Sequence, residues 1–178
     1  MKIFSVLWLV QLLVTSVLTQ DGTGLTGFPT NIYDPFCAMT CLRSIYSLML
    51  SCSSMGDTVG MMTMTTSTEC WASNTPYLTT LAWCMHVKCA EFDIPNSKLE
   101  YFWETQATGQ STVGVRTVPA KWSYAEALAN VPSPPTNQLT TDDMWLNTTS
   151  LVPQETYLAQ WNILTRVQGE STTENKYG

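Results

Sequence analysis

The sequence contains very little histidine. His86 is the single histidine among 178 residues. A hydrolytic triad would need it as the general base, yet it lies between Cys84 and Cys89, which are predicted below to form disulfides, and no nucleophile elbow accompanies it. We therefore interpret His86 as an ordinary helix residue. A P-loop and zinc-ligand spacing are also absent from the sequence, so neither nucleotide hydrolysis nor a structural zinc site is expected.

Basic residues are scarce as well. The chain has 8 Lys and Arg against 14 Asp and Glu, a net charge of −6, and loss of Lys2 with a leader peptide would make it about −7. Such a surface repels phosphate backbones and anionic lipid, which excludes nucleic acid as an expected partner. Charged residues make up only 12% of the chain. This composition, together with its tryptophans, indicates a folded core rather than a disordered tail.

Long apolar runs are absent beyond the N-terminus. The most apolar internal run, 77–87, is interrupted by Thr79, Thr80 and His86, so it predicts a core helix rather than a membrane span. At the N-terminus, Lys2 precedes an uncharged apolar run. That pattern predicts a signal peptide over residues 1–19, with a signal anchor as the alternative, and places the protein outside the cell or at its surface.

The sequence also has no internal repeats and no sustained alternation of apolar and polar residues, the pattern typical of strands. This favours a mostly helical fold. Residues 22–27 match GxGxxG, but they follow the cleavage site and precede Pro29. A dinucleotide fingerprint must instead follow a buried strand and open a helix. We therefore expect an irregular lead-in over residues 20–33.

What the sequence does have is six cysteines spaced in pairs. Two stand four apart in DPFCAMTCLRSIYSLMLSC, two stand five apart in TPYLTTLAWCMHVKC, and the remaining two bracket a loop rich in Met, Thr and Ser. Residues four apart share a helix face. Six cysteines allow 15 disulfide connectivities, and the nested pairing between two antiparallel helices is the one that requires the least distortion of the backbone. The predicted disulfides are Cys37–Cys89, Cys41–Cys84 and Cys52–Cys70. We thus expect a disulfide-stapled antiparallel helical hairpin over residues 34–92.

Each arm of this hairpin has its own start signal. Asp34 is expected to cap the first helix, with Pro35 in its first turn, and Asn74 or Thr75 with Pro76 is expected to open the second. The first helix offers apolar positions at Leu42, Ile45, Leu48 and Leu50. The second offers Leu78, Leu81, Ala82 and Met85. The loop between them, residues 52–70, is predicted to be exposed and mobile.

Short helices and irregular loops are predicted for residues 93–178. Ser97–Glu100 and Ser123–Glu126 each have the spacing of a capping box, the second for a short helix through Ala129. A last helix is expected from Pro153 to about Gln168, with an apolar face. That face consists of Tyr157, Trp161 and Leu164.

Three further features could carry chemistry. Methionines in SMGDTVGMMTMTT could bind Cu(I) through soft thioether sulfurs; the alternative is a loop whose methionines only fill space. The residues concerned are Met55, Met61, Met62 and Met64. Glu100 and Glu104 have the spacing of a helix-face carboxylate pair, which we interpret as a solvated face. Asn147 opens the Asn-Thr-Thr glycosylation sequon.

The chain also resembles a known family. DPFCAMTCLRSIYSLMLSC, TSTECWASNTPYLTTLAWCMHVKC, IPNSKLEYFWETQATG, PAKWSYAEALANV and ENKYG are together similar to the extracellular N-terminal region of fungal ferric-chelate reductases. The likeness runs from Asp34 to Gly178. It implies an exoplasmic region that precedes a bundle of membrane helices, in which histidine pairs hold two haems and cytosolic modules bind FAD and NADPH. None of those parts is present in this sequence, so the resemblance carries over no catalytic residue and no cofactor.

Three hypotheses follow. The first is a non-catalytic head of a ferric-reductase-like protein, linked to iron or copper uptake and in contact with a membrane reductase domain. The second is a free secreted module that binds Cu(I) or Fe(III) chelates. The third is a disulfide-rich secreted interaction protein, such as an effector. The resemblance favours the first, and in all three the chain as it stands is expected not to be an enzyme.

Overall fold

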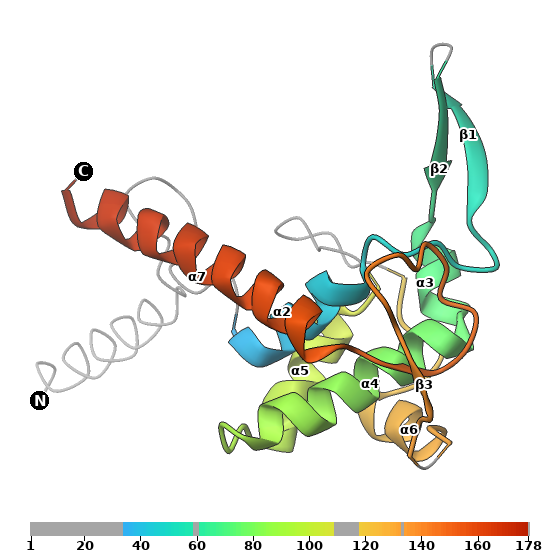
Figure 1. Cartoon of the computed structure of the whole chain (residues 1–178). Coiled ribbons are helices and arrows are strands. Elements are labelled where there is room, and N and C mark those ends of the chain that lie inside the picture. The colour runs from blue at the N-terminus through green and yellow to red at the C-terminus, as the bar shows by residue number, and fades with distance from the viewer. Residues whose placement is uncertain (1–33, 59–60, 109–117, 133, 178) are drawn as a thin grey trace, which may run out of the picture. The chain divides into compact units, whose positions relative to one another are not determined.

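A computed structural model describes residues 34–58, 61–108, 118–132 and 134–177, with the side chains of 56–63 and 170–177 left out (Figure 1). The chain divides into two compact units, and the one described below ends at Thr165. The expected signal peptide, the irregular lead-in and the GxGxxG match lie outside the described residues. The fold is mostly α, as predicted, with short strands added.

Two antiparallel helices form the centre of the structure. Helix α2 spans Phe36–Ile45 and helix α4 spans Thr75–Ala90. The disulfides Cys37–Cys89 and Cys41–Cys84 join them, with Cα–Cα distances of 5.3 and 5.8 Å. The predicted nesting is confirmed, because cysteines four and five apart do lie on facing stripes of the two helices. The helices bury most of the predicted apolar positions, namely Leu42, Ile45, Leu78, Leu81, Ala82 and Met85. The prediction that Leu48 and Leu50 lie on the first helix was wrong, because α2 ends at Ile45; Leu50 is nevertheless buried.

The helix start signals are confirmed in part. Asn74 caps α4 by accepting a 2.9 Å hydrogen bond from the Tyr77 backbone N–H, as expected. The prediction for Asp34 was wrong, because Pro35 is the N-cap of α2. The Asp34 carboxylate instead lies 2.6 Å from Lys98 Nζ, so a distant cation takes the oxygen that was expected to cap the helix.

The two predicted capping boxes have different outcomes. The box at Ser123–Glu126 is present and opens helix α6, Tyr124–Ala129, at the predicted boundaries. Helix α5, Asn96–Gln106, has no side-chain cap, so the box at Ser97–Glu100 was wrong. The physical reason is that the Glu100 carboxylate points to α6 and binds two backbone N–H groups there.

The Met-rich segment was predicted to be an exposed and mobile loop, and the structure instead places two paired strands in it. Strands β1, Ser54–Thr58, and β2, Met61–Thr65, pair as an antiparallel ribbon. Strand β2 leads into helix α3, Thr68–Ser73 (Figure 1). The sequence did not predict these strands, because apolar and polar residues do not alternate along them: Thr, Ser and Met occur on both faces of the ribbon. We call β1 and β2 the methionine ribbon.

A second small sheet and a long helix complete the description. Strands β3, Asn137–Gln138, and β4, Ser150–Leu151, pair in parallel. Helix α7 spans Gln154–Tyr177 and thus runs past the predicted end. Among the predicted positions of its apolar face, Tyr157 and Leu164 are buried, and Trp161 packs against the core. Within the described residues, no helix has the length and apolar character to span a membrane.

Candidate functional site

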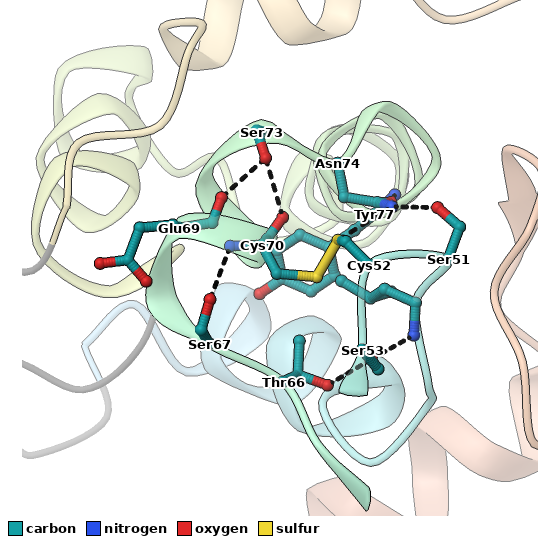
Figure 2. The surroundings of a disulfide bond; sticks show 11 residues. Ser51, Cys52, Ser53, Thr66, Ser67, Glu69, Cys70, Ser73, Asn74 and Tyr77 are labelled. Carbon is teal, nitrogen blue, oxygen red and sulfur yellow. Dashed lines mark hydrogen bonds between the residues drawn. A yellow bond between two sulfur atoms is a disulfide. The ribbon is translucent and has the colours of Figure 1, made fainter. Parts of the chain in front are cut away.

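The base of the methionine ribbon is covalently fixed. The disulfide Cys52–Cys70 ties the segment before β1 to helix α3, with a Cα–Cα distance of 5.6 Å (Figure 2). The hydroxyls of Ser53 and Thr66 share a 2.7 Å hydrogen bond across the two chain segments at the same end. The ribbon therefore starts from a cross-linked base, although its two strands have few apolar residues other than methionine.

Helix α3 is itself held at this base. The Ser67 hydroxyl accepts a 3.2 Å hydrogen bond from the Cys70 backbone N–H, which caps the helix. At the other end of α3, Asn74 Nδ2 donates to Ser51 Oγ at 3.3 Å (Figure 2). Asn74 thus serves two elements, because its other side-chain atom caps α4. The hydroxyl and amide groups around the disulfide connect the ribbon to the central hairpin.

The backbone register divides the four candidate metal ligands. Met55 lies directly opposite Met64 in the ladder. Position 62 is two residues from Met64 on the same strand, so it falls on the same face, whereas position 61 alternates to the other face. Met55 is 69% exposed and Met64 is half-buried, while the side chains of Met61 and Met62 lie outside the description. The ribbon thus groups positions 55, 62 and 64 and separates position 61.

This grouping decides what the ribbon could bind. Opposite positions in an antiparallel pair have Cβ atoms about 4.5–5.5 Å apart. Two or three thioethers on one face are thus near enough to share a soft ion such as Cu(I). Among the residues that the structure describes, no cluster of three or more His, Cys, Asp or Glu could hold a harder metal.

His86 lies on α4, beside an open cavity of about 460 Å³. The cavity is also lined by Asp93, Asn96 and Tyr124, and no serine or cysteine is among its described lining residues. Burial, and after it the charge of Glu100, raises the pKa of Tyr124 to about 12. That phenol therefore keeps its proton at neutral pH.

The carboxylate pair at Glu100 and Glu104 has separate roles. Glu100 Oε2 accepts from Tyr124 N at 3.0 Å and Oε1 accepts from Ala125 N at 2.9 Å, whereas Glu104 is exposed. The solvated-face interpretation therefore holds for Glu104 but not for Glu100. The sequence gave no sign of this role, because the partner helix lies 24 residues further along the chain.

Asn147 is exposed, as a glycosylation acceptor must be. Its sequon is fixed to the core on the C-terminal side: the hydroxyls of Thr149 and Thr79 share a 2.7 Å hydrogen bond, and Ser150 N donates to Thr80 Oγ1 at 3.0 Å. Our sequence reasoning overlooked Trp145. Its signal was an aromatic residue two positions before the sequon asparagine, and it is 44% exposed.

No family model, no curated protein and no solved structure matches the chain. The three disulfides fit a protein that folds in an oxidising compartment. The described cysteines are all paired, so none of them offers a thiolate for catalysis or metal binding.

Proposed function

We propose that this chain is the disulfide-stapled exoplasmic head of a ferric-reductase-like membrane protein, linked to iron or copper uptake at the cell surface. The head itself is non-catalytic. It collects Fe(III) or copper chelates near the membrane reductase domain, or shields the outer face of that domain. The proposal rests on the sequence resemblance and on how the resembling segments lie in the fold.

The observation that carries it is that these segments interlock. The segments 94–108 and 119–131 pack through the Trp103 indole N–H, which donates to the Trp122 carbonyl at 2.7 Å. The first segment also meets the hairpin, where the Tyr77 hydroxyl donates to the Ala107 carbonyl at 2.6 Å. The similar residues of the hairpin and of these two segments therefore belong to one packed scaffold.

The cofactors of such a reductase do not fit this chain. A haem held by paired histidines needs more than one histidine, and His86 is the single one in the sequence. It is exposed on α4, with the ring of Trp83 5.7 Å away. We therefore assign no electron-transfer step to these residues, and any reduction would take place in the membrane part of the protein.

The test is the 3′ sequence of the native transcript. The proposal expects the reading frame to continue beyond the Gly178 codon into hydrophobic spans with paired histidines. A stop codon directly after Gly178 would contradict it. In that case the second candidate below becomes the working hypothesis.

The second candidate is a free secreted module that binds Cu(I) through the methionine ribbon. The observation in its favour is the register, which places positions 55, 62 and 64 on one face. Methionines on one face could bind the same Cu(I) ion, whereas methionines scattered over both faces could not.

The ribbon offers a matched control for this candidate. We expect Met55→Leu, Met62→Leu and Met64→Leu, combined in one variant, to weaken Cu(I) binding at least tenfold. Met61→Leu, on the other face, should leave it within twofold. The measurement is competition with a colorimetric Cu(I) chelator under anaerobic conditions. Equal affinity in wild type, the triple variant and Met61→Leu would rule out the ribbon as a copper site.

A further inference from the structure

The segment before the sequon alternates between solvent and core. Trp145 is 44% exposed, Leu146 is 1% exposed and Asn147 is exposed. In an extended backbone, successive side chains point to opposite sides, so residues two apart share a side. With Leu146 directed into the core, Trp145 and Asn147 therefore both face solvent on the same side.

Backbone hydrogen bonds hold this conformation in place. Met49 N donates to the Met144 carbonyl and Leu146 N donates to the Met49 carbonyl, both at 2.8 Å. They form a parallel bridge between Met49 and Trp145. Together with the bond from Ser150 N to Thr80, they fix the segment on both sides of the asparagine. The positions of Trp145 and Asn147 relative to each other are thus fixed by backbone hydrogen bonds to the rest of the fold.

We propose that Asn147 carries an N-linked glycan whose first sugar lies against the indole of Trp145. An oligosaccharide would be transferred from a lipid diphosphate donor. A bond forms between Asn147 Nδ2 and the sugar C1, the bond between C1 and the diphosphate oxygen breaks, the lipid diphosphate leaves, and Nδ2 gives up one proton. The inference requires passage through the secretory pathway and goes beyond the proposed function.

The indole gives the sugar a reason to settle there. An exposed aromatic face is apolar surface in water, and a pyranose ring presents an apolar C–H face of similar size. Covering Trp145 with the sugar removes part of that surface from water. Because the fold already fixes this segment, packing the sugar against the indole costs conformational entropy of the sugar but none of the backbone. The contact therefore stabilises the folded state.

The experiment uses the 178-residue chain, secreted by a eukaryotic host. One glycosidase trims the glycan to its first N-acetylglucosamine, and an amidase removes that sugar as well. For wild type we expect Tm to hold after trimming and to fall by about 2–4 °C when the last sugar is removed. We also expect ring-current shifts on the protons of that sugar in NMR spectra.

Variants separate the stacking contact from other effects. Trp145→Ala should abolish both the Tm difference and the ring-current shifts, and Trp145→Leu serves the same purpose if the alanine variant does not fold. Met144→Ala, at a neighbouring residue that is 71% exposed, should keep both. The proposal is wrong if the wild-type mass does not change on amidase treatment, or if the Trp145 variants retain the wild-type Tm difference.

Discussion

At the scale of single residues, one carboxylate on α5 organises another helix. The two oxygens of Glu100 bind the first backbone N–H groups of α6. These groups have no partner inside the helix and carry partial positive charge, so a carboxylate is a favourable acceptor. Ser123 and Glu126 complete the same helix start. Two carboxylates and one hydroxyl thus satisfy the start of a helix of six residues.

This arrangement predicts that Glu100→Ala destabilises the protein by about 1–3 kcal/mol, because two hydrogen bonds to a charged acceptor are lost. Glu104→Ala, on the same helix but exposed, is the matched control and should change the free energy of unfolding by less than about 0.5 kcal/mol. Urea unfolding at pH 7 measures both. Equal losses in the two variants would show that the bonds of Glu100 do not contribute to stability.

At the scale of elements, the sequence was informative where the signal is local and periodic. The cysteine spacing defined the hairpin because a helix face repeats every three to four residues. The pattern Ser-x-x-Glu was right at Ser123 and wrong at Ser97, since a carboxylate serves whichever N–H groups the tertiary fold brings to it. The methionine ribbon was missed because its pairing depends on backbone hydrogen bonds, which leave no trace in a run of Thr and Met.

The disulfide at the ribbon base should matter less to the core than those of the hairpin. Replacing Cys52 and Cys70 by Ser opens a disulfide loop with a sequence separation of 18. In the chain-entropy model this lowers the free energy of unfolding by roughly 3 kcal/mol. The helical signal in circular dichroism should remain, because the other two disulfides still join α2 to α4. Hydrogen exchange of the amides in residues 54–65 should become faster.

The comparison variant replaces Cys37 and Cys89 by Ser. It opens a closure of 52 residues, for which the same model gives roughly 4 kcal/mol. Chemical unfolding of both variants, monitored by circular dichroism, ranks them. A larger loss for the ribbon-base variant than for the hairpin variant would show that the ribbon supports the core more than its contacts indicate.

At the scale of the whole molecule, threonine hydroxyls join the later segments to α4. Thr79 and Thr80 are completely buried, yet both are bonded to the 149–150 segment. Buried polar groups are tolerated when they have partners. The predicted helical hairpin thus also anchors the glycosylation sequon, a link that the sequence does not show because the partners lie 70 residues apart.

The buried tyrosines of this core predict loss of stability in alkali. Burial raises the pKa of Tyr124 to about 12, with Glu100 adding to the shift. Burial, followed by the charge of Glu91, also raises that of Tyr157 to about 12. The ordinary value is 10.0, so the folded state holds protons that the unfolded chain releases. Stability is fully present below pH 10 and declines as the pH rises towards 12.

Substitution of these tyrosines tests the predicted loss of stability at high pH. Tyr124→Phe and Tyr157→Phe remove the groups that must ionise, so each should make the fall in Tm between pH 9 and about 11.5 shallower than in wild type. Tyr101→Phe is the matched control, because that side chain is 65% exposed, and it should follow the wild-type curve. The measurement is thermal unfolding across the pH series. Parallel curves for wild type, Tyr124→Phe and Tyr157→Phe would mean that these phenols ionise as readily in the folded protein as in the unfolded chain.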